Sequence, residues 1–389
     1  MFFKRFSVVV LFVFASYHIG VAQEKEYIKI GGALRFNTIV ENYEESNNDL
    51  DVGMKLDTWF LNADAHYSGF DLSLQYRFYS DIKNNFLHHA YVGYKINNQW
   101  YTKLGVFQRP FGIADFASHS WWFQIPYYMG LEDTYGTGIG TSYSHNKWKV
   151  DIAYFHQAPP KGSVADDSAD NAVGNGRYSY AIVPTTGIAD GVRTDASIRE
   201  LNQWNGRVRY SLLKDLELGL SLQLGGIYNS VSDHYKWGLN WALHAVYNPG
   251  RWNIKAEAIG YDFNAESDNG KTLDVIQMAA YGSAYDVASK GNVYLAGIAY
   301  TFPVNKRFIT SIQPYFDYSV VVKAKSEYHN SVHIVPGVLI KSGPIYTYID
   351  YAIGKNQPWL TSYFGQGLGE GKSDARWNGR LNINIGYYF

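Results

Sequence analysis

The chain has 389 residues, of which 34 are basic, 35 are acidic and none is cysteine. The balanced charge gives no electrostatic reason to expect a nucleic-acid partner, and the lack of cysteine excludes a disulfide-stabilised fold. Aromatic residues make up 17% of the chain, and Tyr and Trp are side chains that favour a membrane–water interface.

The first 22 residues have the pattern of a secretory signal peptide. Lys4 and Arg5 precede the apolar run 8–15, and Ala22 ends a short cleavage site of small residues. The apolar run is too short to cross a bilayer, and no later stretch approaches about 18 consecutive apolar residues. The sequence therefore predicts an exported protein of residues 23–389 without a transmembrane helix.

Apolar and polar residues alternate with a period of two from Tyr27 to the end of the chain, and this pattern predicts about sixteen strands. The clearest alternation is the run of leucines at 216, 218, 220, 222 and 224. A further short strand could lie within residues 272–284. In chain order, the predicted strands are 27–40, 59–65, 72–78, 86–96, 100–109, 135–143, 148–156, 204–212, 216–224, 237–247, 251–263, 293–302, 308–322, 332–340, 345–353 and 379–389.

The connections between the predicted strands alternate between short turns and mostly longer loops. The longest are 110–133, the irregular segment 157–199, and 264–290. Bacterial outer-membrane barrels combine short periplasmic turns with longer extracellular loops, whereas a soluble β-sandwich has no reason to keep this order. We therefore predict an all-β protein, a transmembrane antiparallel β-barrel of about sixteen strands, in the outer membrane of a Gram-negative bacterium.

The terminal strand, 379–389, is expected to close this barrel. Its apolar face should contact outer-membrane lipid and lipopolysaccharide, and it must pair with both neighbours because an open edge is not viable in lipid. Its aromatic end at Phe389 resembles the closing strand of bacterial outer-membrane barrels, which implies recognition by the barrel-assembly machinery. The expected lipid-facing residues are Leu381, Ile383, Ile385, Tyr387 and Phe389, and the expected lumenal ones are Arg380, Asn382 and Asn384.

A barrel of about sixteen strands leaves an aqueous channel unless a plug fills it. Few residues separate the cleavage site from the first strand, so we expect an open channel narrowed only by inward-folded loops. The run GVFQRPFG at 105–112, the long third loop after it, and the glycines at 136, 138 and 140 resemble the phosphate-selective porin O/P family. The resemblance implies a homotrimeric diffusion pore for small hydrophilic solutes or for anions such as phosphate, with the third loop, 110–133, as its constriction. We expect the glycines to let the inserted loop lie close to the wall.

The candidate pore-lining residues lie on the strands and on the third loop. No Lys or Arg occurs between Arg109 and Lys147, whereas anion-selective pores place such residues at their constriction. Lys and Arg residues on the inner faces of the strands partly make up for the lack of positive charge in the loop, although Asp64, Asp317 and other acids lie on the same faces. The sequence thus predicts a weakly anion-preferring or general pore rather than a dedicated phosphate channel. The candidates are Lys103, Arg109, Arg35, Arg77, Arg207 and Arg209 on the strands, and Asp115, His119, Trp121 and Trp122 on the loop.

Two other functions remain open for such a barrel. It could be a non-conducting adhesin or scaffold that uses the extracellular loop 157–199. It could also be a rim hydrolase using the cluster Ser118-His119-Ser120 or His156, although the sequence lacks the G-x-S-x-G motif and is not expected to be an enzyme. The loop aromatics could stack against sugars or simply pack against the wall.

We expect no cofactor and no metal site. His88 and His89 are adjacent, and neighbouring residues of a regular strand point to opposite faces, so they should not share a metal ion.

Overall fold

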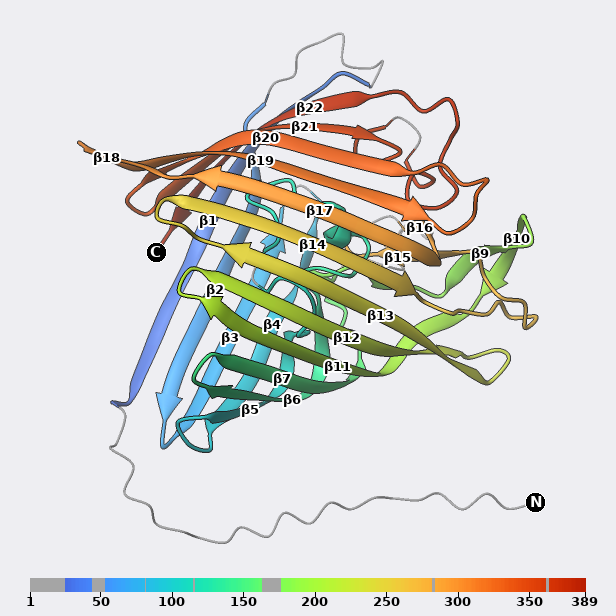
Figure 1. Cartoon of the computed structure of the whole chain (residues 1–389), viewed down its shortest axis with the longest axis horizontal. Coiled ribbons are helices and arrows are strands. Elements are labelled where there is room, and N and C mark those ends of the chain that lie inside the picture. Colours follow the sequence, from blue (N-terminus) through green and yellow to red (C-terminus); the bar gives the residue numbers. More distant parts are fainter. Residues whose placement is uncertain are drawn as a thin grey trace, which may run out of the picture.

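The computed structural model describes residues 25–43, 53–80, 82–114, 116–162, 176–281, 284–361 and 364–389. The expected signal peptide and Asp115 lie outside these residues. The main element is an antiparallel sheet that closes on itself (Figure 1). None of the helices in these ranges combines the length and the apolar character needed to cross a membrane.

The closed sheet confirms all of the predicted barrel strands. Each strand pairs with the next along the chain, and β22 pairs back with β1. β17 and β18 are separated only by Thr301 and both pair with β19, so they occupy one position in a barrel of sixteen. The strands are β1 (Tyr27–Glu41), β2 (Lys55–Tyr67), β3 (Phe70–Tyr79), β4 (Asn84–Lys95), β5 (Trp100–Gln108), β6 (Tyr135–His145), β7 (Trp148–Gln157), β11 (Ile198–Leu213), β12 (Leu216–Asn229), β13 (His234–Tyr247), β14 (Trp252–Asp262), β17 (Lys290–Tyr300), β18 (Phe302–Lys306), β19 (Ile309–Lys323), β20 (Ser331–Ser342), β21 (Ile345–Lys355) and β22 (Asn378–Tyr388).

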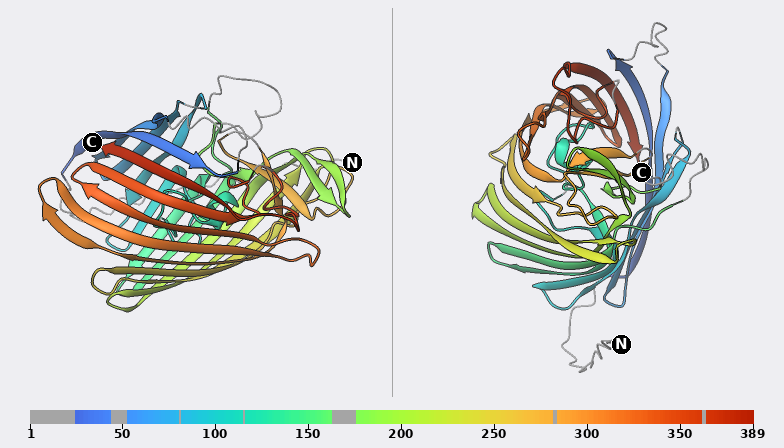
Figure 2. Two further views of the ribbon diagram at one scale, coloured as in Figure 1. Left: turned by 90° about the horizontal axis from the view of Figure 1, so that it is seen from above. Right: turned by 90° about the vertical axis from the view of Figure 1, so that its right-hand side faces the viewer.

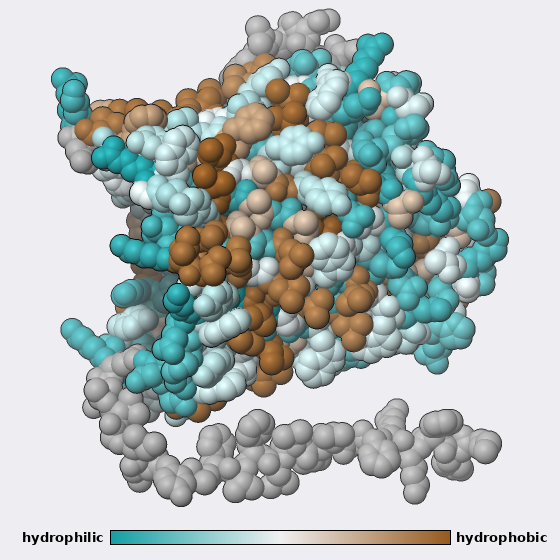
Figure 3. Space-filling view, viewed as in Figure 1, coloured by the Kyte–Doolittle hydropathy of each residue, from teal (hydrophilic) through white to brown (hydrophobic). Residues whose placement is uncertain are grey.

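The barrel has an apolar outer surface and a polar inner one. On β12, Leu218 to Leu224 are between 39% and 50% exposed at every second position, whereas Ser221 is fully buried in the interior. Apolar residues spread across the middle of the outer surface, and hydrophilic residues gather toward the end that carries the long loops (Figure 3). A transmembrane β-barrel requires this distribution, because successive residues of each strand face lipid and lumen in turn.

The terminal strand forms the seam of the barrel. Leu381 to Tyr388 pair with β1, and the backbone N–H and C=O of Phe389 both bond to Gly32 at 3.0 Å. Asn382 and Asn384 are buried on the inner face, while the alternate residues are partly exposed outside. The expected pairing and facing of this strand are therefore confirmed.

Gly32 supports a testable prediction about this seam. A Cβ atom at Gly32 would lie 2.4 Å from the Phe60 carbonyl oxygen and 2.9 Å from the Phe389 ring, so Gly32→Val must displace the paired backbone. We expect a clear loss of assembled, heat-modifiable barrel on unheated SDS gels. Gly206→Ala is the matched control, because nothing lies within 4 Å of the added methyl group. Equal yields of the two variants would contradict the prediction.

Two long connections build a second, smaller sheet at the long-loop end. The segment expected to be the irregular loop 157–199 contains three short strands, and the strand suspected within 272–284 is present as β15. The sheet order is β10-β9-β15-β16, with β8 paired to β15. Its strands are β8 (Ala181–Ile182), β9 (Thr185–Ala189), β10 (Val192–Ala196), β15 (Val275–Ala279) and β16 (Tyr285–Ala288).

The long loops fill much of the barrel interior at their end. Seen from that end, the loops and α1 (Ile125–Tyr128) lie within the ring of strands (Figure 2). We call the buried cluster that they form with the inner wall the loop core. Inward-folded loops were expected, but these loops also bury apolar side chains that no periodic pattern reveals. Its loop members include Tyr127, Tyr128, Tyr178, Tyr180 and Tyr285, with the partly buried Tyr281 packed against them, and its wall members include Phe86, Ile227, Ile259, Val293 and Val321.

Candidate functional site: the third loop and the facing wall

The third loop, between β5 and β6, crosses the barrel interior along the inner wall. Its backbone N–H groups bond to side chains that project inward from four strands. The bonds run from Gly112 to Ser221 Oγ on β12 (3.0 Å), from Ile113 to Glu257 Oε1 on β14 (3.1 Å), from Ile125 to Ser319 Oγ on β19 (3.0 Å), and from Trp121 to Asp350 Oδ2 on β21 (2.8 Å). Side chains of the barrel wall therefore hold the loop through its backbone.

Asp317 on β19 and Asp350 on β21 bind the loop backbone most strongly, since both carboxylates are fully buried and each accepts two of its N–H groups. Asp317 Oδ2 accepts the N–H groups of His119 (2.7 Å) and Ser120 (2.9 Å). Asp350 Oδ2 accepts a second N–H from Trp122 (3.3 Å), and the Tyr315 hydroxyl donates to its other oxygen. Hydrogen bonds to a charged acceptor are stronger than neutral ones. The alternation of the strands predicts that both acids lie on the inner face. It does not predict that they bind the backbone of the third loop.

Two acidic residues near the end of the third loop are themselves buried. Burial, with the nearby Glu257 carboxyl, raises the pKa of Glu132 to about 8. Its Oε1 accepts the Ala117 N–H at 3.0 Å, and Oε2 has no hydrogen-bond partner among the described residues. Burial also raises the pKa of Asp133 to about 7, although hydrogen bonds from Tyr178 (2.5 Å) and Gln108 (2.7 Å) oppose the rise.

Three of the predicted wall cations, Arg35, Arg77 and Lys103, lie against aromatic rings. The Arg35 guanidinium carbon is 4.8 Å from the Trp121 ring centre, and that of Arg77 is 4.4 Å from the Tyr178 ring centre. Lys103 Nζ lies 4.7 Å from the ring centre of Phe107. Within the described ranges, none of the three cations forms a salt bridge with a carboxylate. They lie on the inner faces of β1, β3 and β5, where Arg35 and Lys103 are partly exposed and Arg77 is 8% exposed, and we call the three together the basic wall.

The other three predicted cations are neutralised by ion pairs. Arg109 is 5% exposed and binds Glu200 Oε2 at 2.5 Å, so it is part of a buried pair rather than the surface of an open path. Arg207 and Arg209 both bind Asp151 Oδ2, at 3.1 and 3.4 Å, and Arg209 also lies 3.9 Å from Glu217 Oε1. Because nearby negative charge cancels them, we expect these residues to contribute less than the basic wall to charge selectivity.

The predicted loop residues pack against the wall. His119 Nδ1 lies 2.7 Å from Asp317 Oδ1, and its Nε2 lies 2.6 Å from Asn253 Oδ1. Trp122 lies beneath the guanidinium of Arg380, 4.4 Å from the ring centre to the guanidinium carbon. Together with the Arg35–Trp121 contact, this arrangement favours packing over sugar stacking for the two indoles. Arg380 is one more wall residue that contacts the third loop. Its position on the inner face was expected, but its contact with Trp122 was not.

The glycines of β6 serve a different purpose from the one expected. A Cβ atom at Gly136 would lie 2.6 Å from the Phe155 ring, and one at Gly140 would lie 3.0 Å from the Phe107 ring. These glycines make room for two buried rings of the neighbouring strands, so the expectation that they accommodate the third loop was wrong.

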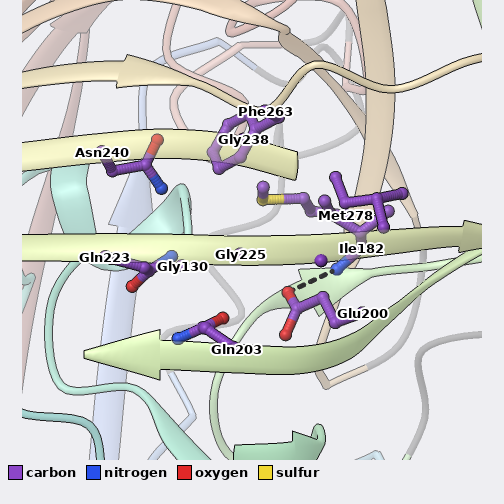
Figure 4. A pocket seen from close by; sticks show the side chains of 12 residues that line it. Gly130, Ile182, Glu200, Gln203, Gln223, Gly225, Gly238, Asn240, Phe263 and Met278 are labelled. Carbon is purple, nitrogen blue, oxygen red and sulfur yellow. Dashed lines mark hydrogen bonds between the residues drawn. The ribbon is translucent and has the colours of Figure 1, made fainter. Parts of the chain in front are cut away.

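A small pocket beside Glu200 is lined by polar side chains, among them Gln203 and Gln223, and by apolar ones, among them Ile182 and Met278 (Figure 4). Asn205 links the two glutamines, since Gln203 Nε2 donates to Asn205 Oδ1 at 2.7 Å and Asn205 Nδ2 donates to Gln223 Oε1 at 3.2 Å. Glu200 Oε1 accepts the backbone N–H of Ile182 at 3.2 Å.

Comparison with solved structures identifies the fold. The anion-selective porin from Comamonas acidovorans is 14% identical, with 94% of this chain and 100% of that chain covered and a TM-score of 0.56. The outer membrane channel DcaP of Acinetobacter baumannii is 12% identical, with 94% and 97% covered and a TM-score of 0.57. The trimer form of OmpT of Vibrio cholerae is 12% identical, with 94% and 100% covered and a TM-score of 0.56. Identities this low show a shared fold alone.

The sequence itself identifies the family. No match was found among curated proteins. The model of the family described as phosphate-selective porin O and P matches residues 45–307, which is more than half of the chain and includes the third loop and two residues of the basic wall, Arg77 and Lys103. The chain therefore belongs to the phosphate-selective porin O and P family and is a diffusion porin of the Gram-negative outer membrane.

Proposed function

We propose that this porin passes small hydrophilic solutes with a preference for anions, and that the basic wall sets this preference. The observation that carries the proposal is a difference in how the inward-facing charged groups are paired. Arg35, Arg77 and Lys103 have no salt-bridge partner in the described part of the chain, whereas the carboxylates of Asp317 and Asp350 bind loop amides. Unpaired positive charge along a narrow path attracts anions and repels cations.

Lys103 is the best residue with which to test this proposal. We expect Lys103→Glu to lower the chloride-to-potassium permeability ratio by about fivefold, because a change of about 1 kcal/mol in the energy of a permeating ion has that effect. The measurement is the reversal potential of the purified protein in a planar bilayer under a KCl gradient. Lys214→Glu makes the same charge change at an exposed turn and should leave the ratio unchanged.

Three outcomes would contradict the proposal. Cation selectivity in the wild type would refute the anion preference. Unchanged selectivity in Lys103→Glu would refute the role of the basic wall. An absence of ion steps would favour the non-conducting adhesin or scaffold.

The geometry gives little support to a rim hydrolase. Both ring nitrogens of His119 face Asp317 and Asn253, and the Ser120 hydroxyl donates to the Trp122 carbonyl at 2.7 Å, so the cluster does not form a nucleophile–base pair. The family and fold are those of a channel, and we infer that the chain is not an enzyme.

We also propose that the protein assembles as a homotrimer with its long loops outside the cell. The similar fold of the trimeric Vibrio cholerae protein supports the trimer. The position of both ends of the described chain at the short-turn end supports the orientation, because outer-membrane barrels place their short turns in the periplasm (Figure 1).

A further inference from the structure

Two cations and two tyrosines form a row across the inner wall at the seam of the barrel. The register places Arg35 of β1 opposite Gly386 of β22. Gly386 lies opposite Tyr346 of β21, which in turn lies opposite Lys341 of β20. The ring of Tyr388 lies over Gly386, since a Cβ atom at Gly386 would be 2.8 Å from this ring. We call Arg35, Tyr388, Tyr346 and Lys341 the seam platform.

The two rings of the seam platform adjoin each other and are accessible from the lumen. The ring centres of Tyr346 and Tyr388 are 5.0 Å apart, with an angle of 42° between the ring planes. Both side chains belong to the inner face and are partly exposed. Tyr346 also packs against the buried Tyr315 and Leu339, which hold its ring in place. The two rings therefore form an apolar corner that a solute in the lumen can contact.

The two cations lie at the ends of this corner. The guanidinium carbon of Arg35 is 5.5 Å from the Tyr388 ring centre, and Lys341 Nζ is 5.0 Å from the Tyr346 ring centre. Neither cation has a salt bridge within the described ranges, and Arg35 Nε has no hydrogen-bond partner there. A guanidinium that stacks on rings still directs its N–H groups outward in its own plane, and a carboxylate is the anion that matches them in pairs.

The acidic side chains of these four strands do not neutralise the platform. Asp350 of β21 accepts two loop N–H groups, and Glu41 of β1 lies 3.1 Å from Arg380. Trp121 of the third loop adjoins the platform, with its ring centre 4.8 Å from the Arg35 guanidinium carbon. Lys341 lies beside the short turn between β20 and β21. A solute that has passed the third loop therefore meets the platform before it leaves the barrel at the short-turn end.

We propose that the seam platform is a binding site for carboxylates that carry a ring, with the carboxylate on Arg35 and the ring against Tyr388 and Tyr346. This inference rests on the proposed function, because it names the class of anion that the anion-preferring pore binds. An aromatic ring attracts the flat apolar face of another ring, aromatic or sugar. Acetate has the charge without the ring, and a neutral glycoside has the ring without the charge, so both should bind more weakly.

Block of the chloride current through single channels in a planar bilayer tests the proposal. We expect benzoate and glucuronate to reach half-block at concentrations at least about fivefold below those of acetate and methyl glucoside, since one ring contact accounts for a factor of this size. The two probes separate aromatic acids from sugar acids, and tighter block by either one supports the site. Block by acetate equal to that by both ring carboxylates would overturn it.

Replacing the tyrosines shows whether the rings are responsible. The double variant Tyr346→Leu/Tyr388→Leu keeps both cations and should need at least about fivefold more ring carboxylate for half-block. Tyr351→Leu is the matched control, because Tyr351 lies on the same strand, β21, but is 44% exposed on the outer face. The single variant Tyr346→Leu provides the same test if the double variant does not assemble.

A second measurement detects binding without conduction. In saturation-transfer NMR of the purified full chain in detergent micelles, benzoate or glucuronate should receive magnetisation from the wild type and clearly less from the double tyrosine variant. Arg35→Gln removes the charge but keeps a side chain of similar length, so it should reduce the transfer to glucuronate to the level of methyl glucoside. Equal transfer to glucuronate and methyl glucoside in the wild type would contradict a role for the cation.

The two experiments separate the failure of this inference from that of the proposed function. A wild type that prefers anions but shows no tighter block by either ring carboxylate, or a double variant that is blocked like the wild type, refutes the binding site alone. A wild type that selects cations, or does not conduct, refutes the proposed function, and the NMR measurement then still decides whether the seam platform binds ring carboxylates.

Discussion

Replacing Asp317 and Asp350 together by alanine should release the third loop from the barrel wall and produce a larger, noisier channel. The two carboxylates accept four backbone N–H groups of the loop, from residues 119 to 122, and both are fully buried. Hydrogen bonds to a charged group contribute about 1.5–3 kcal/mol each, and the bonds lost here leave buried donors unpaired. We therefore expect docking of the loop to weaken by roughly 5 kcal/mol.

Single-channel recording would check this expectation through the mean conductance and the open-channel noise. Asp317→Asn/Asp350→Asn is the informative control, because each asparagine keeps one carbonyl acceptor while losing the charge, and it should lie between the wild type and the alanine variant. Unchanged conductance and noise in an assembled alanine variant would show that these carboxylates do not hold the third loop in place.

Raising the pH should destabilise the wild type, and Glu132→Gln should remove much of this loss. Burial raises the pKa of Glu132 from its ordinary value of 4.5 to about 8, so the folded protein holds this proton more tightly than the unfolded chain does. Stability is then greatest below about pH 4.5 and falls as the pH rises to about 8, since ionisation costs the folded state. The expected loss is on the order of a few kcal/mol, and a glutamine imitates the protonated side chain at every pH.

The check is the thermal unfolding midpoint of the micellar protein at about pH 5, about pH 7 and about pH 9, a series that spans the change. Burial raises the pKa of Asp133 to about 7, so its ionisation contributes a smaller part of the loss of stability, and Glu132→Gln does not remove that part. Asp133→Asn is therefore the companion variant. A wild-type midpoint that rises between about pH 7 and about pH 9 would contradict the sign of the prediction.

The barrel was predictable from sequence because lipid and water impose a regular alternation on every strand that crosses a membrane. This is why the predicted β22 agrees with the structure within one residue at each end. The same alternation places Asp317 and Asp350 on the inner face, but it carries no information about what they bind. Their partners are backbone N–H groups of a distant loop, which leave no trace in the sequence pattern.

The features that the sequence did not predict show no periodic pattern of apolar residues, or they depend on a local break in such a pattern. The loop core gathers tyrosines from separate connections, including Tyr127, Tyr178 and Tyr285, whose neighbours in sequence show no common spacing. In β4, a bulge at His88 and His89 reverses the alternation for one residue, so the expectation that these two side chains point to opposite faces was wrong. The alternation predicts that Arg109 faces the lumen, as a pore residue would. It does not show that the Glu200 carboxylate, 91 residues away in the sequence, neutralises its charge.

The loop core also constrains the order in which the molecule can fold. Its wall includes Phe86 on β4, Ile227 on β12 and Val321 on β19, residues that become neighbours only when strands from the whole length of the chain lie side by side. Contacts between residues so distant in sequence form slowly, because the chain entropy of the intervening segments must be lost first. The core therefore matures after the strands have assembled around it, and a barrel caught before that step would have its strands in register and its interior still wet.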